Sequence, residues 1–252
     1  MPARELLAGV HPVHEALRAG RRSFYRLLLR IGPGPRREEL ALVERLAAHA
    51  GIPVDEVSAE VFEEIAPEGV LHQGVLLEAG PVPEVTLADL VAPATRGAWL
   101  VALDGVEDPQ NLGAILRVAD AAGAAGALLP ERRVAPLSPA AGRASAGAIE
   151  HLPIARVTNL TRALRALQAQ GFWVHGATPD ATLDLYETPD RLFDRRLVLV
   201  LGAEGRGLRP GVRAVVDTLY RIPMRGQVAS LNVASAAAVV LFEWARRDRL
   251  SL

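Results

Sequence analysis

Residues 222–244, IPMRGQVASLNVASAAAVVLFEW, join a polar, glycine-containing loop to a stretch with almost no charge. The second half predicts a helix from Asn232 to Trp244, in which Glu243 is the first acidic residue. We expect so apolar a helix to be buried on most of its sides. The segment Ser230-Leu231-Asn232 would then present polar side chains and unpaired helix N–H groups at the edge of a core, either as a helix cap or as part of a binding site.

The composition limits the chemistry that the chain can perform. Its 252 residues include no cysteine, which excludes disulfides, thiolate metal sites and a cysteine nucleophile. All 28 basic residues are arginines, and the lack of lysine excludes Schiff-base chemistry and a P-loop lysine. We find no pattern of a membrane span or a signal peptide, so we expect a cytoplasmic protein. The six histidines show no metal-ligand spacing, and no metal site is predicted.

The chain divides into three parts that differ in pattern and charge. Residues 1–78 alternate short strands and helices in a small α/β unit, with 9 arginines against 12 acidic residues, a balance of −3. Residues 79–95 hold three prolines and few bulky side chains, so we interpret them as a linker. Residues 96–252 hold 19 arginines against 15 acidic residues, a balance of +4. This last part is therefore the better candidate for contact with a polyanion.

Apolar strands alternate with helices from residue 99 onward. The strands are predicted at 99–104, 126–130, 153–157, 172–178, 197–202 and 220–224. This alternation is typical of a parallel sheet with helices on both faces. Ligands bind such sheets in the loops at the carboxyl ends of the strands. The loops of interest are 104–111, 178–182, 202–209 and 224–232.

Three of these loops carry side chains suited to ligand binding. In the first loop, Asn111 stands where a helix N-cap is expected, and Arg117 should be partly buried and face a carboxylate or phosphate. The loop 202–207, GAEGRG, lets a ligand approach the backbone, but its glycine order is not the dinucleotide fingerprint. Ser230 and Asn232 add a hydroxyl and an amide. The polar residues of any one loop could serve only as a helix cap or in an ion pair. Because all three loops follow strands of one sheet, together they predict a ligand-binding site.

Three long motifs resemble the SpoU, or TrmH-like, family of RNA 2′-O-ribose methyltransferases. They are DGVEDPQNLGAILRVADAAG (104–123), LVLGAEGRGL (199–208) and IPMRGQVASLNVASAAAVVLFE (222–243). The resemblance covers residues 97–248 and implies an α/β-knot (SPOUT) fold, in which a parallel sheet accompanies a deep trefoil knot. Residues 1–78 and 143–160 resemble the subgroup that methylates a guanosine in the peptidyl-transferase P loop of 23S rRNA. In that subgroup the N-terminal unit is an L30e-like, RNA-binding domain.

The resemblance also implies roles for individual residues. The catalytic centre would take polar side chains from the three motifs, namely Asn111, Arg117, Glu204, Ser230 and Asn232. S-adenosylmethionine would bind in a bent shape to the backbone of Thr178, Gly202, Gly205, Ile222, Met224 and Leu231. The implied partners are RNA and a second copy of the chain, because the family is dimeric and the partner subunit helps to form the active site.

Arg117 is a poor candidate for a general base, because a guanidinium has a reference pKa of about 12.5–13.8. We interpret it as a group that binds the target phosphate and stabilises the developing alkoxide, oriented by Glu204 and Asn111.

Other functions remain open at the sequence level. A tRNA 2′-O-methyltransferase shares the architecture, although the separate N-terminal unit favours rRNA. A non-catalytic RNA-binding or ribosome-assembly protein on the same fold is the alternative from another class, and the complete set of five polar residues argues against it. A nucleotide-dependent oxidoreductase predicts a glycine-rich loop after the first strand and an acidic residue about 20 positions later, and neither is present.

Overall fold

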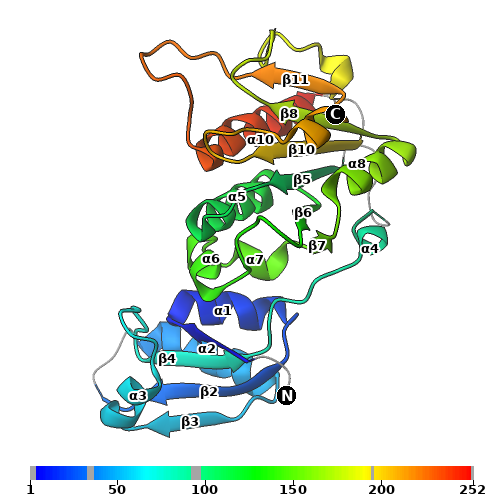
Figure 1. The fold of residues 1–252 in the computed structure, drawn as a ribbon. Helices are drawn as coiled ribbons and strands as arrows, with labels where there is room; N and C mark the ends of the chain where they lie inside the picture. The colour runs from blue at the N-terminus through cyan, green and yellow to red at the C-terminus, as the bar shows by residue number, and fades with distance from the viewer. Residues whose placement is uncertain (1–3, 33–36, 92–97, 194–195, 251–252) are drawn as a thin grey trace.

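The structure, a computed structural model, describes residues 4–32, 37–91, 98–193 and 196–250. Two sheets organise these residues: a four-stranded sheet near the N-terminus and a seven-stranded sheet in the rest (Figure 1). Within the described ranges, no helix combines the length and the apolar character that crossing a lipid bilayer requires.

The N-terminal sheet has the strand order β1-β4-β2-β3, in which β4 is antiparallel to both neighbours and β3 is parallel to β2. Its elements are β1 (Glu5–Ala8), α1 (Val10–Ala19), β2 (Phe24–Arg30), α2 (Arg37–His49), β3 (Val54–Val57), α3 (Ala59–Ile65) and β4 (Val75–Ala79). Helices α1 and α2 cover one face, where Val13, Val43 and Leu77 share a core. On the other face Phe62 of α3 packs on Leu28.

The C-terminal sheet has the order β7-β6-β5-β10-β8-β11-β9, and its neighbouring strands are parallel. The prediction of an α/β protein with a parallel sheet is therefore confirmed. The strands are β5 (Trp99–Asp104), β6 (Gly126–Pro130), β7 (Ile154–Val157), β8 (Phe172–Ala177), β9 (Leu183–Asp184), β10 (Arg196–Gly202) and β11 (Thr218–Arg221). The helices are α5 (Pro109–Ala122), α6 (Pro139–Ala144), α7 (Ala148–His151), α8 (Leu160–Ala169), the 3₁₀ helix η1 (Asp190–Leu192), α9 (Pro210–Arg213) and α10 (Val233–Leu250).

Helices cover both faces of this second sheet. Ile115 of α5 and Leu241 of α10 share one buried cluster, whereas Leu164 of α8 and Val212 of α9 belong to the cluster on the other face. All six residues of β5 are buried, as expected for a central strand between two helix layers. The carboxyl ends of β5, β10, β8 and β11 consequently meet at one edge of the sheet.

The predicted linker, 79–95, starts at the last residue of β4, and its part from Val82 to Val91 packs against the C-terminal sheet. Val82 is buried, Val85 forms a parallel bridge with Ala155, and Leu90 and Val91 of α4 (Leu87–Val91) are buried in the core. Residues 92–95 lie outside the described residues. The segment through residue 91 is thus held along the sheet by apolar contacts, which its prolines alone did not predict.

A buried ion pair joins the end of α1, in the N-terminal unit, to α7, in the C-terminal unit. Arg22, which follows α1, donates from Nε and Nη2 to the two carboxylate oxygens of Glu150 in α7, each at 2.7 Å. Both side chains are nearly inaccessible, at 2% and 4% exposure. His151 of α7 also contacts Glu15 of α1 at 2.7 Å. Because a buried charge without its partner is costly, this pair holds α1 on α7 in one orientation.

Candidate functional site

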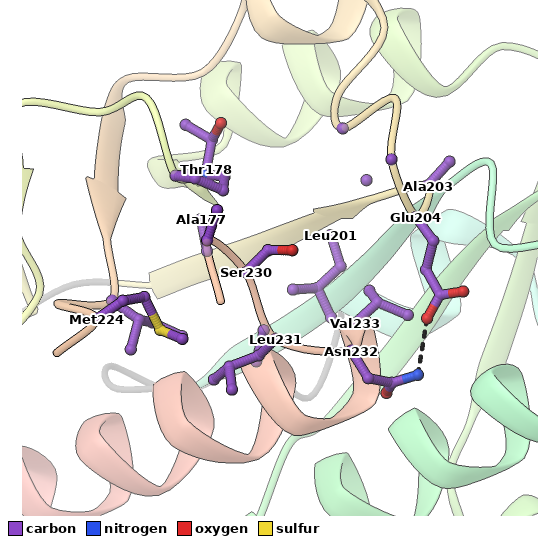
Figure 2. A pocket seen from close by; sticks show the side chains of 17 residues that line it. Ala177, Thr178, Leu201, Ala203, Glu204, Met224, Ser230, Leu231, Asn232 and Val233 are labelled. Carbon is purple, nitrogen blue, oxygen red and sulfur yellow. Dashed lines mark hydrogen bonds between the residues drawn. The ribbon is translucent and has the colours of Figure 1, made fainter. Parts of the chain in front are cut away.

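A cleft of about 420 Å³ opens at the carboxyl ends of β8, β10 and β11, against the start of α10 (Figure 2). All of the residues predicted to hold the cofactor line it, namely Thr178, Gly202, Gly205, Ile222, Met224 and Leu231. Three predicted catalytic residues line it as well, namely Glu204, Ser230 and Asn232. Residues far apart in sequence are brought together here because parallel strands end at a common edge.

Asn232 connects the loops around this cleft. Its Nδ2 donates to Oδ1 of Asn111 at 2.9 Å and to Oε1 of Glu204 at 2.7 Å (Figure 2 shows the second bond). Its Oδ1 accepts the backbone N–H groups of Ala234 at 2.8 Å and Ser235 at 3.4 Å. Asn232 is therefore both the N-cap of α10 and the link between the first two motifs, so the cap and the site are one feature.

Glu204 lies at the tip of a tight hairpin. Ala203 and Gly207 exchange two backbone hydrogen bonds, of 3.2 and 2.9 Å, and Gly205 between them has a φ of +73°. A Cβ on Gly202 would lie 2.3 Å from the carbonyl carbon of Gly207. The glycines are thus required by the fold of the hairpin, in addition to any approach of a ligand.

Asp104 anchors the base of this hairpin, and the sequence did not single it out. Its carboxylate is fully buried at the end of β5 and accepts hydrogen bonds from the backbone N–H of Arg209, at 2.8 Å, and from the guanidinium of the same residue. Asp104 also stands opposite Gly202 in the β5–β10 register. An acidic residue ending an otherwise apolar strand is the signal that could have revealed it, because a buried carboxylate requires a partner.

Thr178 is held at the rim of the cleft by a second chain of polar contacts. Its hydroxyl donates to Asp180, which accepts two further hydrogen bonds from the guanidinium of Arg213, at 3.1 and 2.9 Å. The hydrogen bond from Thr178 and those from Arg213 hold the pKa of Asp180 below its ordinary value. The loop after β8 is consequently fixed to α9.

Arg117 does not lie where its sequence context predicted. The side chain is exposed, not partly buried, and it forms no hydrogen bond or ion pair with any described residue. It lines a different cleft, of about 490 Å³, together with His11, Glu15 and His151. The apolar neighbours misled the prediction because they face the sheet, while Arg117 points away from it.

Asn111 is also placed differently from its predicted position. The N-cap of α5 is Asp108, whose carboxylate accepts the N–H of Gln110 at 3.0 Å. Pro109 follows at the first helical position, where its missing N–H does no harm. Asn111 is therefore inside the helix, where its nearly buried side chain is available to bind Asn232.

Helix α10 is buried on one face only, contrary to the expectation that it is buried on most sides. Val240 and Leu241 are fully buried, whereas Phe242 is 52% exposed. Ala238 and Val239 are half-buried on the same outward side. The residues before the helix, Ser230 to Asn232, are exposed in the cleft. The uniform apolar composition hid this asymmetry, because alanine is compatible with either environment.

The fold and the cleft define a two-part α/β protein whose ligand site lies at the carboxyl ends of a parallel sheet. The model of the SpoU rRNA methylase family matches residues 98–242, and that of RNA 2′-O ribose methyltransferase substrate binding matches residues 6–85. The chain belongs to the SpoU rRNA methylase family. Among the described residues, no group of His, Asp and Glu is arranged to hold a metal ion.

Individual relatives resemble the chain over nearly its whole length. The 23S rRNA (guanosine-2′-O-)-methyltransferase RlmB of Vibrio cholerae is 38% identical, covering 97% of this chain and 98% of the relative. The SpoU methyltransferase AviRb from Streptomyces viridochromogenes matches with a TM-score of 0.80 at 25% identity, covering 98% and 90% of the two chains. An AdoMet-bound rRNA methyltransferase from Sinorhizobium meliloti matches with a TM-score of 0.79 at 30% identity, covering 96% and 87%.

Proposed function

We propose that the protein transfers a methyl group from S-adenosylmethionine to the 2′-oxygen of a guanosine ribose in 23S rRNA, in the peptidyl-transferase P loop. The observation that carries this proposal is the joining of Asn111, Glu204 and Asn232 beside the cleft. The relatives support it, since RlmB of Vibrio cholerae is named for guanosine-2′-O methylation of 23S rRNA.

The cleft fits S-adenosylmethionine in size and charge. Its volume of about 420 Å³ is in the range of small-molecule sites. Glycines and apolar side chains make up most of its wall, and Glu204 is the one charged side chain among the described residues that line it. A carboxylate in a cleft without arginine suits a sulfonium cation. The cofactor supplies the electrophilic methyl group, and the relative from Sinorhizobium meliloti is an AdoMet-bound enzyme.

The remaining chemistry belongs to the polar side chains. Methyl transfer needs the ribose oxygen in line with the methyl group, and it needs stabilisation of the negative charge that develops on that oxygen. Asn232, which also donates to Asn111, holds Glu204 at the rim, and Ser230 adds a hydroxyl there. Arg117, proposed to bind the target phosphate and stabilise the alkoxide, lies outside this cleft in its own chain. We therefore assign Arg117 to the cleft of a partner subunit.

A homodimer is supported by the outward faces of α5 and α10, which lie side by side on the sheet (Figure 1). On α10 the apolar stripe consists of Ala238, Val239 and Phe242. On α5 the half-buried Ala114 and Val118 flank Arg117 on the outward side. Association through this face would bury the stripe and carry Arg117 toward the partner's cleft. Light scattering of the purified protein should give twice the chain mass.

The remaining parts of the proposal concern the topology of the chain, its location in the cell and its division into domains. We infer a deep trefoil knot that includes α10, a cytoplasmic enzyme, and a division into an RNA-binding domain (1–78), a linker (79–95) and a catalytic domain (96–252). The match of the substrate-binding family model to residues 6–85 supports the first of these domains.

The decisive experiment incubates the purified protein and methyl-labelled S-adenosylmethionine with a P-loop fragment of 23S rRNA, and separately with tRNA. We expect label on one guanosine 2′-oxygen of the rRNA fragment and none on tRNA. Transfer to tRNA alone would contradict the substrate, and cofactor binding without transfer to either RNA would favour a non-catalytic RNA-binding protein.

A further inference from the structure

A second cleft, of about 620 Å³, adjoins the cofactor cleft and has no part in the chemistry described above. One of its sides is the segment after β9, with Asp184, Tyr186 and Glu187. The other is the chain that leaves β11, including Arg225. The two clefts share Ile222, Met224 and Leu231 as a common wall. Met224 lies at the end of the cofactor cleft away from the Glu204–Asn232 bond, as Figure 2 shows.

Tyr186 presents an unused aromatic ring to this second cleft. The residue is 54% exposed, and its ring forms no hydrogen bond, ring contact or cation–π contact with a described residue. Its backbone is nevertheless fixed: its N–H donates to Asp184 at 2.9 Å, and its carbonyl accepts from Arg247 at 3.3 Å. By contrast, the ring of Tyr25 lies under Arg4, and that of Tyr220 is buried. Aromatic residues make up only 4% of the chain. An exposed ring on a backbone that is held in place, beside the cofactor cleft, is suited to bind a ligand.

The charged groups of the cleft are complementary to a nucleotide. Arg225 and Glu187 are both exposed, and neither forms an ion pair with a described residue. The carboxylate of Asp184 already accepts the N–H of Tyr186. Met224 and Leu231, each 39% exposed, add apolar surface. A guanidinium suits a phosphate, a free carboxylate accepts the amino hydrogens of a base, and an aromatic ring stacks on a base of any sequence.

We propose that this second cleft binds one nucleobase of the RNA strand whose ribose is methylated, a base other than the target. The base stacks on Tyr186, its exocyclic amino group donates to Glu187, and Arg225 contacts the adjoining phosphate. Adenine, guanine and cytosine carry such an amino group, and uracil does not. The inference rests on the proposed function, because it takes the substrate to be single-stranded RNA at the cofactor cleft. The shared wall of the two clefts places the site on the path of that strand.

The first test compares Tyr186→Ala with Tyr186→Phe, which keeps the stacking surface and is the matched control. Binding of a fluorescein-labelled P-loop RNA fragment is measured by anisotropy, and S-adenosylmethionine binding by calorimetry. We expect Tyr186→Ala to weaken RNA binding by about 5- to 150-fold, the range for loss of one base stack. Tyr186→Phe should bind RNA like the unmodified protein, and both variants should bind the cofactor with unchanged affinity.

The second test concerns the base. The unmodified protein should bind oligocytidylate more tightly than oligouridylate, since uracil lacks the amino group. Glu187→Gln should remove that preference, because an amide can either donate or accept.

The outcomes separate this inference from the proposed function. If the unmodified protein methylates the rRNA fragment but Tyr186→Ala binds it as tightly as Tyr186→Phe, the second cleft is not a base site. A change in cofactor affinity in Tyr186→Ala would instead make the ring part of the cofactor site, and a change in oligomeric state would make it a subunit contact. Either result overturns the inference. A lack of methyl transfer by the unmodified protein contradicts the proposed function alone. In that case the RNA affinities of Tyr186→Ala and Tyr186→Phe still show whether the second cleft binds a base.

Discussion

At the scale of single residues, Asn232 combines two duties that mutation can separate. Asn232→Ala removes the cap of α10 and the two bonds to Asn111 and Glu204. We expect the free energy of unfolding to fall by about 1 kcal/mol, and methyl transfer to fall by roughly 100-fold or more. Chemical denaturation and labelled-methyl transfer measure the two effects.

Asn232→Ser is the matched variant, because serine is an equally good N-cap but cannot reach both partners. Stability should return while activity stays low. Recovery of both would show that Asn232 matters only as a cap.

His175 provides a test that depends on pH. Its ring is fully buried among Phe193, Tyr220 and Trp244, and neither ring nitrogen has a hydrogen-bond partner in the described structure. Burial lowers the pKa of His175 to about 4, although the charge of Asp217 opposes this effect. The unfolded chain, with an ordinary pKa of about 6.5, therefore binds the proton first as the pH falls.

We expect His175 to destabilise the fold progressively from about pH 6.5 down to about pH 4, by up to roughly 3 kcal/mol. The free energy of unfolding, measured by urea titration across this range, should fall less steeply in His175→Phe than in the unmodified protein. Parallel pH curves for the two proteins would show that His175 does not titrate in this way. Acidic groups titrate in both proteins, so the difference between the curves isolates the histidine.

At the scale of elements, the Glu204 hairpin depends on the contact between the buried carboxylate of Asp104 and the partly exposed Arg209. Asp104→Asn keeps the shape but replaces a charged acceptor with an amide, leaving the guanidinium poorly matched. We expect a loss of about 1–2 kcal/mol in unfolding free energy, because the Asp104 carboxylate is buried while the Arg209 side chain is 39% exposed to solvent. The KM for S-adenosylmethionine should rise more than kcat falls, because the hairpin lines the cofactor cleft.

Glu150→Gln is the control for Asp104→Asn. It disrupts the pair with Arg22, which is more deeply buried than the Asp104–Arg209 contact and lies away from the cofactor cleft. Stability should fall at least as much as in Asp104→Asn, with an unchanged KM for the cofactor. Equal KM shifts in the two variants would mean that general destabilisation, and not the hairpin, sets cofactor affinity.

The elements also show how far the sequence could predict the structure. Apolar runs such as β5 and β10 specify a parallel sheet, because burial on both faces leaves no room for polar residues. In a parallel sheet the loops after the strands lie along one edge, so the sequence also predicted that Glu204 and Asn232 lie close together. The sequence pattern did not predict that the side chains of Arg117 and Phe242 point away from the sheet. Both lie in helices rich in alanine, whose small side chains mark neither the buried nor the exposed face.

At the scale of the whole molecule, the joint between the two units determines how the N-terminal unit can act. Arg22→Met removes the guanidinium that binds Glu150, Glu5 and the carbonyl of Gly80. We expect the unfolding free energy to fall by about 3–5 kcal/mol and the two units to separate more readily. Small-angle scattering should report a larger radius of gyration.

RNA affinity in Arg22→Met should decline as well, while cofactor binding stays unchanged. Unaltered scattering and RNA affinity would show that the other contacts of α1 with α7, such as that between Glu15 and His151, suffice to fix the joint. The double variant Arg22→Met/Glu150→Leu removes both charges and should recover part of the stability, since apolar replacements of a buried pair are often tolerated.

The bond between Asn232 and Asn111 spans 121 positions of the chain, and it is made by a residue near the C-terminus. The cofactor cleft can therefore form only after Asn232 has been synthesised and α10 has packed against α5. A chain that has folded only as far as β11 therefore has the Glu204 hairpin but lacks the wall of the cleft that Asn232 and the start of α10 provide. The cofactor site is thus completed by contacts between distant segments, later than the strands that surround it.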